Sequence, residues 1–310
     1  MKINLANIKK AKKILNKSDC IAIPTETVYG LAGNAYSNKA CKKIFKLKKR
    51  PKNNPLIVHY HNYQDLKKDC IFNNSFIKLY KKFCPGPITF ILDLKKSSLI
   101  SKFATNNRRS LAVRFPKHPV TRNLLKKLNY PLAAPSANLS SKVSAVSSND
   151  VKDDFGKKIK YILEGGKSLI GLESTIVDIR NKPKILRLGS LEISLIQKVL
   201  NKKVTINNNS LKISAPGQFK LHYSPGIPIR LNVKKIKKNE AYLLINKKKK
   251  TKSNYYFLSK NGNLKESAKN LYSMLRKIKK DKFKSIAVSK IPNKGLGKTI
   301  NDRLMRASKF

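Results

Sequence analysis

Hydrophobic residues recur every three or four positions along several stretches of the chain, the spacing that places them on one face of an α-helix. In residues 4–17 this face carries Leu5, Ile8 and Leu15 among many lysines. We predict further helices over residues 38–49, 75–83, 119–128, 191–200, 264–280 and 299–308. A serine and an aspartate three positions apart in residues 147–150 indicate one more helix start.

Other stretches are short apolar runs or alternate between apolar and polar residues, which is typical of strands. In residues 110–115, Leu111 and Val113 lie on one face and Ser110 and Arg114 on the other. Runs of these kinds predict strands over residues 20–23, 56–60, 88–94, 110–115, 131–134, 160–163, 174–179, 184–188, 227–231, 240–246, 255–259 and 283–289. Strands and helices alternate, so we expect an α/β protein.

The pattern changes over residues 201–226, where a polar stretch at 207–210 is followed by two Pro-Gly breaks. A chain of 310 residues is long enough for two domains of ordinary size. We therefore predict a larger domain over residues 1–200, a linker over 201–226, and a small α/β domain over 227–310. No internal repeat is visible.

Charge is the most unusual feature of the composition. Lysine and arginine number 69 against 16 aspartates and glutamates, a formal net charge of +53. The lysines are spread along the whole chain, and lysine and asparagine both have A/T-only codons. Compositional drift and contact with nucleic acid are therefore equally good explanations of the charge. Either origin speeds encounters with anions such as nucleotides and RNA, while a hydrophobic fraction of 40% excludes a wholly disordered chain.

The cysteines and the N-terminus narrow the class of protein. The four cysteines include no CxxC pair, which argues against zinc or redox motifs and fits a reduced, cytoplasmic protein. Residues 1–17 lack the apolar core of a signal peptide, and no apolar run approaches the ~20 residues of a membrane span. Residues 295–299 resemble the tail of a phosphate-binding loop, but its first glycine is missing because position 292 is proline.

Polar side chains gather where predicted strands end. Residues 24–35 carry hydroxyls, a carboxylate, a phenol and glycines between a strand and a helix, the usual place for a ligand-binding loop. Lys48 and Arg50 stand two apart in a segment that the next proline makes extended, so both can face one anion. Ser136 and Asn138 share this spacing and offer uncharged hydrogen bonds.

Two more polar residues end predicted strands. Arg114 stands where an arginine can clamp a carboxylate through two parallel hydrogen bonds, and His59 ends the strand over residues 56–60. Taken singly, each of these features is better explained by an ordinary turn, a helix cap, a strand-end residue or a solvated charge.

The order of these features along the chain is more specific than any one of them. The segments concerned are residues 24–33, 48–51, 54–59, 85–89, 111–116, 133–138, 165–166, 171–178 and 185–189, followed by 215–217, 222–225, 295–297 and 301–308. Together they closely resemble the YrdC/TsaC-type threonylcarbamoyl-AMP synthase family in its long, two-domain form. The resemblance implies a twisted mixed sheet flanked by helices around a basic cavity, plus a smaller Rossmann-like α/β domain at the C-terminus.

The resemblance also implies a reaction. L-threonine, bicarbonate or CO2, and ATP would give threonylcarbamoyl-AMP and pyrophosphate, and a tRNA threonylcarbamoyl-transfer complex would use the product. The family holds threonine at the positions of Thr25, His59, Arg114, Ala134 and Ser174. It holds ATP at the positions of Lys48, Arg50, Asn54, Ser110, Ser136, Ser144 and Arg187.

Within that set, the family's catalytic KxR and SxN motifs fall on Lys48, Arg50, Ser136 and Asn138. Tyr223 of the linker would fold over the nucleotide as a lid and exclude water. Mg²⁺ is expected on the phosphates, mostly through phosphate oxygens and water, and the sequence assigns no carboxylate to it.

The chain departs from the family pattern in places: Cys84 replaces an aromatic residue, and Val143 and Ala145 replace prolines on either side of Ser144. Two other functions stay open. One is a paralogue that makes a different carbamoyl adenylate, against which the complete KxR and SxN motifs argue. The other is a basic protein of the same fold that binds RNA or the ribosome. Scattered lysines without aromatic stacking motifs argue against it.

Overall fold

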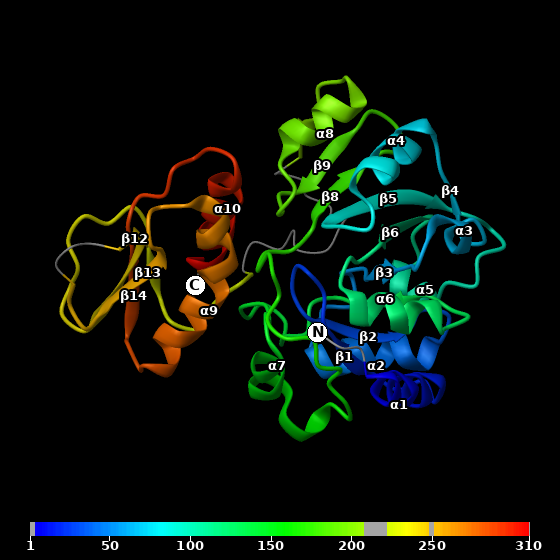
Figure 1. Ribbon diagram of the computed structural model, residues 1–310, viewed down its shortest axis with the longest axis horizontal. Helices are drawn as coiled ribbons and strands as arrows, with labels where there is room; N and C mark the ends of the chain where they lie inside the picture. Colours follow the sequence, from blue (N-terminus) through cyan, green and yellow to red (C-terminus); the bar gives the residue numbers. More distant parts are fainter. Residues whose placement is uncertain (1–3, 208–221, 248–250, 310) are drawn as a thin grey trace.

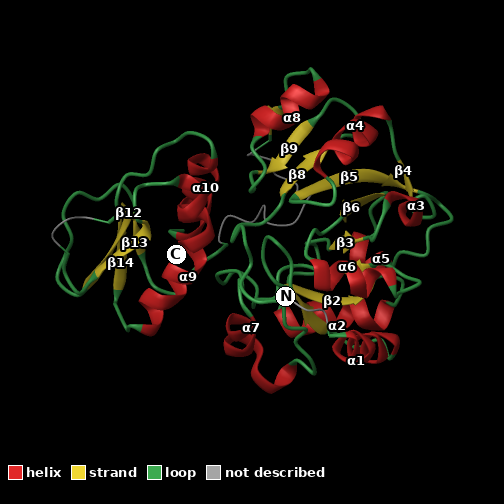
Figure 2. Cartoon of the chain, in the orientation of Figure 1, coloured by secondary structure: helices red, strands yellow, loops and turns green. Residues whose placement is uncertain are grey.

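Two sheets organise the computed structural model, which describes residues 4–207, 222–247 and 251–309 (Figures 1 and 2). The strands of the larger sheet are β1 (Ile21–Ile23), β2 (Gly30–Asn34), β3 (Ile57–His59), β4 (Cys70–Ile71), β5 (Ile88–Leu94), β6 (Ser110–Arg114), β7 (Leu132–Ala133), β8 (Thr175–Asp178), β9 (Lys184–Arg187) and β10 (Thr205–Ile206). They lie in the order β1-β2-β7-β3-β6-β5-β8-β9-β10, with β4 paired to β5. Parallel and antiparallel pairs alternate irregularly, so the sheet is mixed.

Helices cover both faces of this sheet. They are α1 (Leu5–Asn16), α2 (Asn38–Lys48), α3 (Tyr63–Leu66), α4 (Asn74–Phe83), α5 (Lys102–Thr105), α6 (Pro119–Lys126), α7 (Ser148–Phe155), a 3-10 turn η1 (Gly156–Lys158), and α8 (Ile193–Leu200). The apolar sides of α2, α4 and α8 join one hydrophobic cluster, and those of α1 and α6 join another. Each helix buries one face because its apolar residues recur at helical spacing.

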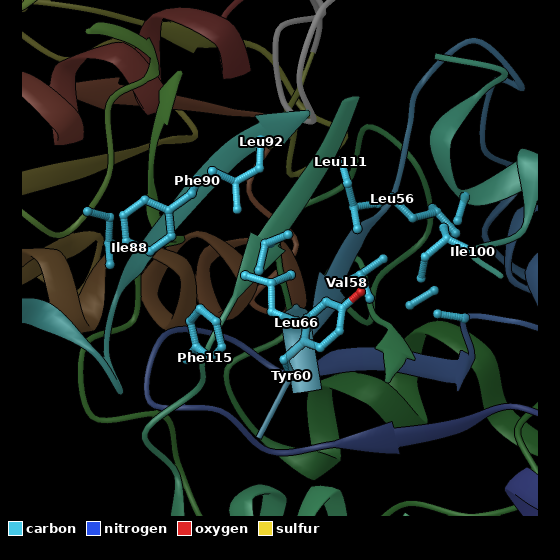
Figure 3. Close-up of a cluster of buried hydrophobic side chains, with 14 of the residues drawn as sticks. Leu56, Val58, Tyr60, Leu66, Ile88, Phe90, Leu92, Ile100, Leu111 and Phe115 are labelled. Atoms are coloured by element: carbon cyan, nitrogen blue, oxygen red, sulfur yellow. The ribbon is translucent and has the colours of Figure 1, made fainter. Parts of the chain in front are cut away.

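The main core packs under the centre of the sheet, where Phe90, Leu111 and Phe115 point the same way (Figure 3). Alternation along each strand sends the intervening side chains to the other face. There Ile57 and Ala112 belong to a small, separate apolar cluster. Ile57 also lines the cavity described below, so this small cluster forms part of its floor.

The second sheet is entirely parallel. Its strands are β11 (Ile229–Arg230), β12 (Glu240–Asn246), β13 (Tyr255–Ser259) and β14 (Ser285–Val288), in the order β11-β14-β12-β13. Helices α9 (Leu264–Lys280) and α10 (Leu296–Ala307) pack on the side of this sheet that faces the larger one (Figure 1). Both helices therefore present residues to the larger sheet's loops.

The predicted α/β architecture is confirmed, with a mixed sheet and a smaller parallel one. The prediction of a strand over residues 160–163 is wrong: Ile162 makes only an isolated bridge to Ala22. Strand β2 was not predicted, because its sequence Gly-Leu-Ala-Gly-Asn lacks the β-branched residues that mark strands. The strands β4 and β10 and the single-turn helices α3 and α5 were also not predicted.

The predicted linker contains a short strand near its start, β10, which pairs with β9 of the larger sheet. Most of the rest, residues 208–221, lies outside the described residues, including the 215–217 motif. The division at residues 200 and 226 stays a prediction. Among the described residues, no helix is long and apolar enough to cross a membrane.

Candidate active site

A cavity opens beside β3, β6, β8 and β9. The space within it is about 510 Å³ when the solvent in its open mouth is counted. Its lining residues are Thr25, Val28, Tyr29, Gly30, Arg50, Ile57, His59, Arg114, Ala134, Pro135, Ser136, Glu173, Ser174, Arg187, His222 and Tyr223. The sheet explains part of this set, because His59 and Arg114 are register partners on neighbouring parallel strands.

The structure brings together most of the residues that the sequence singled out. Those that line the cavity are Thr25, Arg50, His59, Arg114, Ala134, Ser136, Ser174, Arg187 and Tyr223. Three more of these residues lie behind the lining and hydrogen-bond to it: Lys48 to Ser136, Asn54 to Arg50, and Ser144 to Glu173. Asn138 lies further back and accepts from Lys48. Ser110 does not join them: it opens β6, at the other end of the strand from Arg114, and pairs with Asp93.

One end of the cavity is built around Arg114, which is only 4% exposed. Its Nη2 donates to Oε1 of Glu26 at 2.7 Å, and the backbone N–H of Lys117 donates to the other carboxylate oxygen at 2.9 Å. The Nε of Arg114 and the Nδ1 of His59 are buried without a hydrogen-bond partner among the described residues. Buried polar atoms of this kind are normally paired, so this end has capacity for a polar ligand.

His59 is neutral in this setting. Burial, and next the positive charge of Arg114, lower the pKa of its imidazole well below the ordinary value. A neutral imidazole can accept or donate a hydrogen bond without repelling an ammonium group.

Thr25 has a local role. Its hydroxyl donates to the carbonyl of Val28 at 2.6 Å and lies 2.9 Å from the hydroxyl of Thr27. Its own carbonyl accepts from Ser168 Oγ at 3.0 Å. Thr25 therefore holds the loop between β1 and β2 in shape, and its side chain is already engaged.

Arg187, which also lines the cavity, is hydrogen-bonded to Ser174. Its Nη2 donates to the carbonyl of Ser174 at 2.8 Å and to its hydroxyl at 3.1 Å, and the hydroxyl also lies 2.7 Å from that of Thr89. Gly189 allows this close packing, because a Cβ there would stand 2.2 Å from the backbone nitrogen of Thr175. A larger residue at position 189 would push this loop away from the cavity wall.

The two sequence pairs are joined by hydrogen bonds. Lys48 Nζ donates to the carbonyls of Ser136 and Asn138 at 2.6 and 2.5 Å, so the lysine supports the loop that carries the Ser-x-Asn pair. Arg50 Nη2 donates to Asn54 Oδ1 at 2.6 Å. Lys48 therefore stabilises the loop of Ser136 and Asn138 from inside the protein, whereas Arg50 lines the cavity itself.

These cations are crowded in a buried place. Burial, and next the charge of Arg187, lower the pKa of Arg50 to about 9. Burial and then Arg50 lower the pKa of Lys48 well below its usual range. The buried positive charges create a positive electrostatic potential in the cavity. Binding of an anionic ligand would reduce the repulsion among them.

Two residues from the described end of the linker, His222 and Tyr223, also line the cavity. Tyr223 is 1% exposed and adopts a left-handed backbone conformation, φ 65°, which is uncommon for a residue with a side chain. Ser224 holds it there, since its N–H donates to the carbonyl of Ser141 at 2.8 Å and its carbonyl accepts from Val143 at 3.2 Å. The Tyr223 hydroxyl has no partner among the described residues.

The described residues hold no group of three potential metal ligands. Both carboxylates near the cavity are already engaged: Glu26 by Arg114, and Glu173 by Arg303 at 3.0 Å. These two glutamates, and His222, were not given roles from sequence. Each stands inside a segment of the family pattern, but only the fold shows what the carboxylates contact.

Comparisons with known proteins show the family to which the chain belongs. The family described as "Telomere recombination" matches residues 13–189, and "Threonylcarbamoyl-AMP synthase, C-terminal domain" matches residues 191–309. Proteins named threonylcarbamoyl-AMP synthase from Pyrococcus abyssi and Bacillus subtilis are each 33% identical over 98% of this chain and 94% of their own. A crystal structure of P. abyssi Sua5 complexed with L-threonine has a TM-score of 0.91 and 30% identity, covering 99% of this chain and 96% of that one.

Proposed function

Because the chain belongs to the threonylcarbamoyl-AMP synthase family, in its two-domain form, we propose that it condenses L-threonine, bicarbonate or CO2, and ATP into threonylcarbamoyl-AMP and pyrophosphate. The observation that carries the proposal is that two groups of cationic and polar residues line one cavity. Arg114 is the register partner of a neutral His59, and Arg187 acts electrostatically on Arg50. The first pair suits an α-amino acid, and the second suits a polyphosphate.

Threonine would lie at the Arg114 end. Glu26 orients the guanidinium through one nitrogen and leaves Nε for the substrate carboxylate. His59, Ser174, Ala134 and the Thr25 loop would surround the remaining atoms. L-threonine is the ligand of the similar P. abyssi protein.

ATP would lie beside Arg50 and Arg187. Its proposed contacts are Lys48, Arg50, Asn54, Ser136, Ser144, Arg187 and Tyr223, with Ser110, at the far end of β6, proposed from the family resemblance alone. Of these, Lys48, Asn54 and Ser144 would act from behind the lining, through the backbone or side chain that each supports. Arg50 and Arg187 would neutralise charge on the phosphates as pyrophosphate leaves.

The chemistry needs positioning more than a protein base. The threonine amine attacks the carbon of CO2 or bicarbonate and forms a carbamate, with water lost in the bicarbonate case. A carbamate oxygen then attacks the α-phosphorus of ATP, and the bond to the β-phosphate oxygen breaks. Holding the amine, the carbon and the α-phosphate together in a charged cavity supplies most of the acceleration.

We propose Mg²⁺ as the metal that accompanies ATP. The carboxylates near the cavity are engaged by arginines, so the ion would be held by phosphate oxygens and water. When bound, it would supply positive charge that offsets the charge of the leaving pyrophosphate.

The product would pass to a tRNA threonylcarbamoyl-transfer complex in the cytoplasm. The four cysteines are free thiols, which fits a reducing compartment. Direct RNA contact remains a second candidate role, favoured by the net charge of +53.

The chemical identity of the product tests the proposal. Purified protein is incubated with ATP, Mg²⁺, L-threonine and isotope-labelled bicarbonate, and the adenylate is isolated and its mass measured. We expect an adenylate that carries both threonine and the labelled carbon. An adenylate without the label, or labelling that L-serine supports as well as L-threonine, would point to a paralogous reaction.

A further inference from the structure

Tyr223 enters the cavity from the linker, yet it packs against the C-terminal helices. The guanidinium carbon of Arg303, on α10, lies 4.7 Å from the centre of the Tyr223 ring. The ring of Tyr272, on α9, lies nearly parallel to it, at 17° and 5.8 Å between centroids. The ring thus contacts a cation and a second aromatic ring, both from the unit that carries the parallel sheet (Figure 1).

The same two residues meet the catalytic sheet at Glu173. Its carboxylate accepts from Arg303 Nε at 3.0 Å, from the Tyr272 hydroxyl at 2.9 Å and from Ser144 Oγ at 2.6 Å. Glu173 itself lines the cavity and directly precedes Ser174. One carboxylate therefore connects the C-terminal helices to the wall where Ser174 and Arg187 lie.

These contacts are rigid for a physical reason. Arg303 is 1% exposed and Tyr272 is fully buried, and the remaining guanidinium nitrogens of Arg303 donate to Asp302 and to the carbonyl of Leu188. A buried, fully hydrogen-bonded charge network has few alternative arrangements. Burial alone would raise the pKa of Glu173, but Arg303 and then Arg187 outweigh it and hold the value at about 2, so the carboxylate stays charged at working pH.

We propose that Arg303 and Tyr272 are positioning residues of the active site. They hold the Tyr223 ring beside the part of the cavity where Arg50 and Arg187 would bind ATP. Through Glu173, they also fix the position of this ring relative to Ser174. This gives the C-terminal unit a direct part in ATP binding. The inference rests on the proposed function in taking ATP as the ligand beside Tyr223.

The test is a double-mutant cycle read by ATP binding. Arg303→Lys keeps a cation near Glu173 but loses the planar group that lies on the ring. We expect it to weaken ATP binding about thirtyfold, the size of a desolvated cation–π contact, and to leave the Kd for threonine, measured without ATP, unchanged. In a Tyr223→Ala background, Arg303→Lys should weaken ATP binding no further.

Asp153→Asn is the matched control. Asp153, on α7, pairs with Lys280 of α9 at 2.6 Å, so this change also breaks an ion pair between the two units, at a more exposed place than Arg303. It should leave both Kd values unchanged, even if the melting temperature falls. Tyr272→Phe, which keeps the ring and removes only its hydroxyl, should weaken ATP binding less than Arg303→Lys does.

Two results would overturn the proposal. One is an unchanged Kd for ATP in folded Arg303→Lys protein. The other is an Arg303→Lys effect of equal size with and without Tyr223, because Arg303 would then act by another route. Since the readout is binding of ATP by equilibrium dialysis, wild-type protein that binds ATP but makes no threonylcarbamoyl-AMP would contradict the proposed function alone.

Discussion

Arg114 illustrates how a single residue of this cavity divides its hydrogen-bond donors between a protein partner and a ligand. One nitrogen is committed to Glu26, and Nε is open. The motif identified the arginine, but no sequence pattern pairs it with a carboxylate 88 residues away. The same holds for Glu173 and Arg303, 130 residues apart. Residue types were predictable here, and their partners were not, because the partners are chosen by the tertiary fold.

Arg114→Ala should raise the threonine requirement far more than the ATP requirement. Loss of hydrogen bonds from a charged group to the substrate carboxylate costs about 1.5–3 kcal/mol, or roughly 10–100-fold in the threonine KM. Steady-state kinetics with each substrate varied in turn measures the two effects.

The substitution also leaves Glu26 buried without its partner, which destabilises a protein by itself. The double variant Arg114→Ala, Glu26→Gln removes both charges and serves as the control. Equal losses for threonine and ATP in the double variant would exclude Arg114 as the carboxylate clamp.

Glu173 gives a prediction for acid stability. Its pKa is about 2 in the folded protein against an ordinary 4.5, so its contribution to stability is complete above about pH 5 and is lost as pH falls toward 2. The whole contribution is about 3 kcal/mol, of which about 2 kcal/mol disappears between pH 5 and 3. Denaturant unfolding across this range should show a shallower pH dependence for Glu173→Gln than for wild type, and parallel curves would contradict the account.

Among the helices and strands, the bounds were predicted most accurately where the hydrophobic periodicity of the sequence is strong. The predicted bounds of β5, β12, β13 and α9 match the structure because each carries an uninterrupted pattern. Short edge elements were not predictable in this way, and β2 was hidden by its glycines. The strand predicted over residues 160–163 failed since only Ile162 bridges to a neighbouring strand.

The linker element carries a prediction of its own. Tyr223→Ala should increase unproductive release of the adenylate, because the buried ring that excludes water is gone. Tyr223→Phe keeps the ring and loses only the unpartnered hydroxyl, so it should retain most of the coupling. The ratio of pyrophosphate released to adenylate retained on the protein measures this. Unchanged coupling and turnover in Tyr223→Ala would make the linker only a tether.

At the scale of the whole molecule, the net charge of +53 and the cavity are separate electrostatic features. The charge lies mostly on lysines along the surface, where salt screens it, whereas Arg50 and Arg187 are each 8% exposed. Composition revealed the first feature. The second required the fold that brings these two arginines to one wall.

This separation predicts different salt responses. Between 50 and 200 mM salt, nonspecific RNA binding should fall by roughly a thousandfold or more, as expected for several phosphate contacts. The KM for ATP should change by less than about tenfold, because buried charges are screened less. Filter binding and steady-state kinetics at matched salt make the comparison, and a KM that follows the RNA curve would place the ATP contacts on the surface.

Pyrophosphate release from ATP by the purified protein, with and without L-threonine and bicarbonate, is the most direct test of synthase activity. We expect release that requires both co-substrates and that is much slower with L-serine. Release that does not depend on threonine, or no release at all, would contradict the synthase function and would turn attention to bound RNA.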